Sequence, residues 1–91
     1  MTGPPAFDPG RPWRLHPRVA LREEPFGALA YHYDNRRLVF LKAPRLVELL
    51  RALERFETAG EAVAAVVDPG ARSGYEQALS RLAAAQVIDV R

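Results

Sequence analysis

The sequence predicts an α+β domain with a winged helix-turn-helix-like layout, in which a three-stranded antiparallel meander precedes three helices and a short C-terminal strand. Three observations predict this class. Short apolar stretches separated by turn-forming residues fill positions 19–42, apolar residues with helical spacing follow, and the chain has only 91 residues, of which 48% are hydrophobic and 26% charged. Such a length and composition are typical of one small globular domain.

The strands of the meander are separated by residues that favour turns. The first strand is expected at 19–22 and the second at 28–33, with proline and glycine marking the turn at 23–27. Residues 34–36, Asp-Asn-Arg, predict a tight reversal, because Asp and Asn side chains bond to nearby backbone in turns. The third strand is then expected at 37–42, and the short links make the three strands antiparallel.

The helices are expected to begin at residues that suit a first turn. The first covers 44–57 and starts with a proline, and the second opens with a capping box at 58–61. The third covers 73–85 and opens with a second capping box at 73–76, and a short strand at 87–90 ends the domain. One apolar stripe of the third helix consists of Tyr75, Ala78, Leu79, Leu82 and Ala83.

The first 12 residues contain four prolines and two glycines, and they are expected to form a mobile tail before a domain at 13–91. Trp13 and Leu15 interrupt the polar character of this region. We expect both side chains to attach the tail to the core. A contact between Trp13 and a partner is the alternative.

The composition argues against catalysis and against metal or cofactor chemistry. There is no Cys, and His16 and His32 have no further ligands at suitable spacing, whereas a zinc site needs about four ligands. No serine lies in a nucleophile motif, and no glycine-rich phosphate loop is present. We therefore expect no catalytic residue, no metal and no cofactor.

No apolar run approaches the ~20 residues of a membrane span and no signal pattern is seen, so a cytoplasmic protein without a membrane partner is expected.

The third strand is apolar on both faces. Leu38 and Phe40 point to one side and Val39 and Leu41 to the other, whereas a half-buried strand alternates apolar with polar residues. Either this chain or a partner must cover the second face. A basic residue stands at each end of the strand, but no charge or proline guards the edge between them. The pattern predicts β-augmentation, in which a peptide adds as a further strand. The expected peptide-binding residues of this strand are Arg37, Leu38, Val39, Phe40, Leu41 and Lys42.

The helix at 73–85 is expected to form the second wall of the binding site. Tyr75, Leu79 and Leu82 would line an apolar trough that faces the third strand, with Tyr75 as an anchor for the peptide. Two alternatives remain open. Leu79 and Leu82 can instead pack in the core, and the edge strand can pair with a second copy of the chain to give a homodimer.

The same layout allows a DNA-binding regulator as an alternative function. In such domains the third helix enters the major groove, where Arg81 and Gln77 would read bases while Arg36 and Arg37 contact phosphate. The net charge is only +2 and few cations are well placed, which predicts weak, salt-sensitive binding. We therefore expect no nucleic-acid partner.

Three segments carry a family resemblance: Trp13-Arg14-Leu15-His16-Pro17-Arg18-Val19, Phe26-Gly27-Ala28-Leu29-Ala30-Tyr31 and Leu38-Val39-Phe40-Leu41-Lys42. Residues 17–90 as a whole resemble the PqqD-like domains, the peptide-recognition elements of ribosomal peptide natural-product pathways. The three segments resemble, among these, the precursor-peptide chaperones of mycofactocin pathways. The resemblance implies a non-catalytic domain that binds the leader of a precursor peptide antiparallel along 37–42 and against 73–85. It also implies delivery of the precursor to a radical S-adenosylmethionine maturase, and the iron–sulfur clusters belong to that enzyme.

Overall fold

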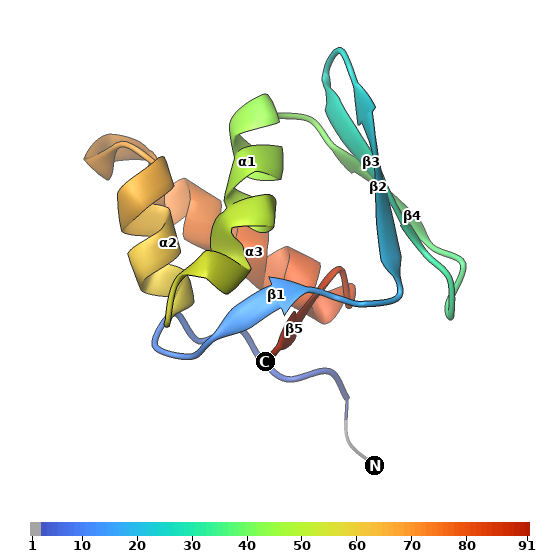
Figure 1. Ribbon diagram of the computed structural model, residues 1–91, viewed down its shortest axis with the longest axis horizontal. Helices are drawn as coiled ribbons and strands as arrows, with labels where there is room; N and C mark the ends of the chain where they lie inside the picture. The colour runs from blue at the N-terminus through green and yellow to red at the C-terminus, as the bar shows by residue number, and fades with distance from the viewer. Residues whose placement is uncertain (1–2) are drawn as a thin grey trace.

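A three-stranded antiparallel sheet forms one side of the structure, a computed structural model that describes residues 3–91 (Figure 1). Its strands are β2 (Val19–Glu24), β3 (Gly27–His32) and β4 (Leu38–Leu41), in the order β2-β3-β4. The helices lie beside one face of this sheet, and the opposite face is turned away from them. The α+β class and the meander predicted from the sequence are confirmed.

The turn between β3 and β4 fixes how these strands pair. The His32 N–H donates to the Arg37 carbonyl oxygen at 3.0 Å, and the Arg36 N–H donates to the His32 carbonyl oxygen at 2.8 Å. Arg36 has a φ of 60°, and the Asn35 side-chain oxygen accepts the Arg37 N–H at 2.9 Å. The tight reversal predicted from these residue types is therefore confirmed.

Three α-helices and two short 3-10 helices follow the sheet in the described part of the chain. They are α1 (Pro44–Ala52), the 3-10 helix η1 (Leu53–Arg55), α2 (Ala59–Val66), the 3-10 helix η2 (Pro69–Ala71) and α3 (Arg72–Ala84). The sequence predicts one continuous first helix over 44–57. Its α-helical part instead ends at Ala52, and η1 continues the chain with the tighter 3-10 geometry that is common at helix ends.

The two predicted capping boxes have different outcomes. At the start of α2, the Thr58 hydroxyl oxygen accepts the Glu61 N–H at 3.1 Å, which confirms the Thr58 cap, one of the two hydrogen bonds of the predicted box. The prediction for Ser73 is wrong, because Ser73 lies inside α3 and the residue before that helix is Ala71. Ala71, the last residue of η2, already has right-handed helical backbone angles, whereas a capping residue needs an extended backbone.

A second, two-stranded sheet joins the start of the domain to its end (Figure 1). In it β1 (Trp13–Leu15) pairs antiparallel with β5 (Ile88–Val90), and Trp13 lies opposite Val90. The final strand is thus confirmed, although the sequence did not indicate β1 as its partner. Trp13 is completely buried, and its indole N–H donates to the Asp8 carbonyl oxygen at 2.9 Å. The expected attachment of the N-terminal segment through Trp13 is confirmed.

The N-terminal segment contacts α2 before the chain reaches β1. The carbonyl oxygens of Pro9 and Arg11 accept the N–H groups of Gly60 and Ala59, at 2.8 and 3.0 Å. These bonds supply partners to amides that the start of a helix leaves without one. The tail predicted over residues 1–12 therefore has defined contacts in its second half, and residues 1 and 2 lie outside the described residues.

The hydrophobic core lies between the two sheets and the helices. Its largest fully buried side chains are Trp13, Leu41, Leu49, Leu50, Leu53, Val63, Leu79, Val87 and Ile88. The buried leucines of the first helical region follow the spacing that the sequence predicts. Within residues 3–91, every helix is too short or too polar to cross a lipid bilayer.

Candidate functional site

The outer edge of β4 is open. β4 pairs with β3 alone in its sheet, so one of its two edges has no neighbouring strand. Along an antiparallel strand, every second residue directs its N–H and C=O groups to the same neighbouring strand. The His32 N–H of β3 donates to the Arg37 carbonyl oxygen, so the backbone groups of Val39 and Leu41 also point toward β3. The N–H and C=O groups of Leu38 and Phe40 point to the open edge. No backbone group from elsewhere in residues 3–91 forms a hydrogen bond with them there.

An apolar groove lies between this edge and α3. A part of about 300 Å³ lies between β4 and α3. A part of about 520 Å³ continues from it along α3 toward η2 and the start of α1 and has no β4 residue in its lining. The two parts share Leu46 and Ala78, and together they are called the β4–α3 groove. The first part is lined by Val39, Phe40, Leu41, Leu46, Ala78, Arg81, Leu82 and Ala85. The second part is lined by Ala43, Leu46, Gly70, Ala71, Ser73, Gly74, Tyr75 and Ala78.

The α3 side of the groove is long enough for a short extended peptide. Tyr75, Ala78, Leu82 and Ala85 follow helical spacing and therefore share one face of the helix. The step from Tyr75 to Ala85 spans roughly 15 Å at ~1.5 Å per helical residue. An extended chain rises ~3.3 Å per residue, so roughly four or five peptide residues fit along this wall.

The groove brings together most, but not all, of the residues singled out from the sequence. Val39 is half-buried and Leu41 is 1% exposed, and both line the groove from β4. Tyr75 and Leu82 line its α3 wall. Leu79 has no exposed surface and Leu82 is 6% exposed. Both belong to the core, which is the alternative that the sequence left open for them, although Leu82 also lines the groove.

The side chains of Leu38 and Phe40 lie on the opposite face of β4. They are 54% and 57% exposed and point away from the helices. The prediction that β4 is apolar on two faces is confirmed, and within the described residues its second face is not covered. Arg37 and Lys42 flank the strand, are exposed, and form no ion pair within residues 3–91.

Four residues that line the part of the groove beside β4 were not among the expected peptide-binding residues, namely Leu46, Ala78, Arg81 and Ala85. Ala78 belongs to the apolar stripe predicted for this helix and Ala85 continues the same face, so helical spacing was a signal that could have placed both in the groove. Their small side chains leave the space between α3 and β4 open. Leu46 comes from the first turn of α1, and no local sequence pattern places it beside β4.

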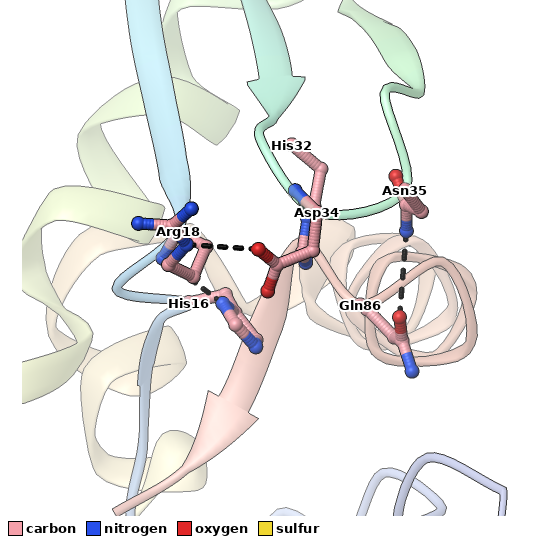
Figure 2. A network of polar contacts seen from close by, with 6 residues as sticks. All are labelled: His16, Arg18, His32, Asp34, Asn35 and Gln86. Atoms are coloured by element: carbon pink, nitrogen blue, oxygen red, sulfur yellow. Dashed lines mark hydrogen bonds and ion pairs between the residues drawn. The ribbon is translucent and has the colours of Figure 1, made fainter.

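Polar contacts hold the β3–β4 turn against the end of α3 (Figure 2). The Asn35 amide nitrogen donates to the Gln86 side-chain oxygen at 3.4 Å, and Gln86 lies just beyond α3 with a φ of 65°. On the other side of the turn, the Arg18 guanidinium donates to the Asp34 carboxylate at 2.9 Å. Exposed pairs of this kind contribute little stability. We interpret them as contacts that orient the turn and so position β4 relative to α3.

His16 and His32 lie next to each other near the same turn, with ring centroids 4.5 Å apart (Figure 2). Their Nδ1 atoms accept the backbone N–H groups of Arg18 and Asp34, at 3.0 and 3.1 Å. Both rings therefore act as hydrogen-bond acceptors that hold the backbone. In the part of the chain that the structure describes, no three side chains of His, Asp or Glu gather as a metal-binding group.

Arg81 is the charged residue among those that line the groove. It lies on the exposed side of α3, and it forms no ion pair within residues 3–91. An unpaired guanidinium beside an apolar surface favours a ligand that carries a carboxylate.

A domain with an open strand edge beside an apolar groove has the architecture of a module that binds another chain. Comparison with known sequences gives this module its family. The protein belongs to the peptide chaperone MftB family, whose sequence model matches residues 12–89.

Curated relatives support the same assignment. The chain is 45% identical over 88 residues to the peptide chaperone MftB of Mycobacterium ulcerans (strain Agy99), covering 96% of this chain and 81% of the relative. It is 43% identical over 83 residues to the peptide chaperone MftB of Mycobacterium tuberculosis (strain ATCC 25618 / H37Rv), covering 90% and 76%. No solved structure gives a significant match. The resemblance to PqqD-like mycofactocin chaperones is confirmed, and a chaperone has a non-catalytic role.

Proposed function

We propose that this protein binds the leader of a ribosomally made precursor peptide in the β4–α3 groove. It presents the bound precursor to a radical S-adenosylmethionine maturase of mycofactocin biosynthesis. The observation that carries the proposal is the open edge of β4 beside an apolar groove. The protein would act in the cytoplasm, where the ribosome makes the precursor.

Backbone pairing would supply affinity that depends little on the sequence of the leader. Leu38 and Phe40 each offer one N–H and one C=O group to an added strand. Each new backbone hydrogen bond contributes about 0.5–1.5 kcal/mol net. We expect the leader to run antiparallel to β4, because antiparallel pairing is slightly more stable than parallel pairing.

Side chains of the leader would supply selectivity. Alternate side chains of an added strand point to the same face of the sheet, so every second leader residue would face the groove. There it would meet Val39, Ala78 and Leu82, which line the groove. Burial of one apolar side chain contributes about 1.5–3 kcal/mol, while ordering a flexible peptide costs about 2–5 kcal/mol. This balance permits binding that is specific and still reversible.

The chaperone would aid the maturase by holding the precursor close to it. A leader bound to a docked chaperone keeps the rest of the precursor at a high effective concentration near the enzyme. No reactive group on this chain takes part in such a mechanism. The family assignment also favours peptide binding over the DNA-binding alternative. Arg81, considered above for base reading, lines the groove instead.

Filling the groove tests the proposal. Ala78 lines the groove, whereas Ala84 is an exposed residue near the end of the same helix. Alanine and leucine are both good helix formers, so Ala78→Leu and Ala84→Leu should leave α3 intact. We expect Ala78→Leu to weaken binding of a synthetic leader at least tenfold by titration calorimetry, and Ala84→Leu to change it less than twofold. Equal leader affinities for the two variants would contradict binding in this groove.

Presentation of the precursor to the maturase is tested separately from leader binding, through the yield of modified precursor. The yield of modified precursor is measured with maturase and precursor alone, and then with each chaperone variant added. The wild-type chain and Ala84→Leu should raise the yield, and Ala78→Leu should raise it much less at the same concentration. A maturase that modifies the precursor equally well without the chaperone would contradict presentation, even if the leader binds.

A further inference from the structure

The face of the three-stranded sheet that points away from the helices is apolar and exposed. Phe26, Tyr31, Leu38 and Phe40 are 43%, 36%, 54% and 57% exposed, and the Phe26 and Phe40 rings lie edge to face with centroids 6.2 Å apart. Together with Leu29 these residues form the outer sheet face, which contains a hollow of about 410 Å³. The exposed face of an antiparallel sheet is normally polar. A contiguous exposed apolar patch is typical of a surface that binds another macromolecule.

Unpaired positive charges surround this face, whereas its negative charges are paired. The carboxylate that lines the hollow, Glu24, is already paired with Arg22 at 2.6 Å, and Asp34 in the β3–β4 turn is paired with Arg18 at 2.9 Å. Three further cations at the two ends of β4 are exposed and form no ion pair within residues 3–91, namely Arg36, Arg37 and Lys42. A partner with acidic groups around an apolar centre would complement this pattern. A second copy of the chain would bring the same cations to the interface.

The size of the outer sheet face also favours a transient partner over a stable homodimer. Three strands ~4.8 Å apart, with four to six residues of ~3.3 Å each, give a footprint on the order of 300 Å². A stable interface buries about 800 Å² per partner. The face is therefore suited to the weak, reversible docking that a handover of substrate requires.

The outer sheet face and the β4–α3 groove share one strand. Val39 and Leu41 line the groove, while the neighbouring Leu38 and Phe40 carry their side chains on the outer sheet face. A leader added at the edge of β4 would widen the sheet, and every second leader side chain would join the outer sheet face. A partner on this face would therefore contact both the chaperone and the bound leader.

We propose that the outer sheet face is the docking surface for the maturase, through an apolar patch with an acidic rim on that enzyme. This inference rests on the proposed function, because it assumes that the leader occupies the edge of β4. It implies that the loaded chaperone binds the maturase more tightly than the empty one. By thermodynamic linkage, the maturase then tightens leader binding by the same factor.

Two substitutions outside the groove test the proposal. Phe26 and Tyr31 belong to the outer sheet face but do not line the groove. Binding of the full-length double variant Phe26→Ser/Tyr31→Ser to the purified maturase and to a synthetic leader is measured separately. We expect the maturase affinity to fall at least tenfold while the leader affinity changes less than twofold. Glu61→Ser, on the exposed side of α2, serves as the control and should change neither affinity.

The outcomes separate the two proposals. Maturase binding that is unchanged in the double variant, with leader binding intact, would overturn the docking surface but leave the leader groove in place. A wild-type chain that fails to bind leader would contradict the proposed function itself. Concentration-dependent dimerisation of the wild-type chain that the double variant abolishes would assign the face to a second copy and overturn the inference.

If the double variant fails to fold, NMR signals of Leu29 and Tyr31 in the wild-type chain replace it. These signals should broaden when maturase is added, and unchanged signals at saturating maturase would overturn the inference.

Discussion

Gly27 lies so close to the carbonyl oxygen of Leu41 that a Cβ atom added at Gly27 would be 2.0 Å from it. Gly27 also has a φ of 148°, a backbone conformation that side chains disfavour. Leu41 pairs with the next residue, Ala28, and the start of β3 can approach the end of β4 this closely only because position 27 is glycine. The contact fixes the end of β4 that leads into α1 and the groove.

Replacement of Gly27 by alanine should destabilise the domain. The strained φ and the clash with Leu41 each cost about 1–3 kcal/mol, partly relieved by movement of β4. For a domain of this size, each kcal/mol lowers the midpoint of thermal unfolding by roughly 4–8 °C. Gly70→Ala is the matched control, because a Cβ atom there meets nothing within 4 Å. Equal unfolding midpoints for the two variants would contradict the close approach.

Removal of the Trp13 side chain should destabilise the domain by about 3–5 kcal/mol, as for other large buried aromatic residues. Trp13 has no exposed surface, and it connects the N-terminal segment and β1 to the core. Chemical denaturation of Trp13→Ala measures the loss. Leu38→Ala, at a side chain that is 54% exposed, should change the free energy of unfolding by no more than about 0.5 kcal/mol. A similarly small loss for Trp13→Ala would show that the β1–β5 sheet is not part of the cooperative core.

Reversal of the charge at Arg81 should weaken leader binding, because Arg81 lines the groove and has no ion-pair partner within residues 3–91. We expect Arg81→Glu to lower the affinity for the leader roughly tenfold, or about 1.4 kcal/mol, and to reduce its dependence on salt. Arg55→Glu makes the same charge change at an exposed position in η1, outside the groove, and should have little effect. Titrations of both variants at two salt concentrations make the comparison. Identical losses of leader affinity in the two variants would mean that leader binding depends on the net charge of the chain and not on the position of Arg81.

Local chemistry predicted the parts of the fold that depend on neighbouring residues. The alternation of Leu38 to Leu41, the Asn35 turn and the Thr58 cap all rest on contacts within a few positions, and the structure confirms them. The Ser73 cap was wrong because the preceding 3-10 helix had already set the backbone in the helical region. A capping box is recognised from four neighbouring residues, but those residues do not show the backbone conformation in which the chain enters the helix.

Features that depend on contacts distant in the sequence could not be predicted in the same way. β1 has only three residues, and its partner β5 lies at the other end of the chain. The carbonyl groups of Pro9 and Arg11 bond to the start of α2 without any side-chain signature. In the groove, the position of Leu46 depends on how α1 packs beside β4, and the complete burial of Leu79 depends on which face of α3 turns inward.

Amide hydrogen exchange at β4 tests the central claim most directly. The alternating bond pattern gives the Val39 and Leu41 amides partners on β3, whereas the Leu38 and Phe40 amides point to the open edge. Saturation with a leader peptide should therefore slow exchange at Leu38 and Phe40 at least tenfold, with little change at Val39 and Leu41. Unchanged exchange at Leu38 and Phe40 while the leader is bound would show that the peptide does not add to this strand.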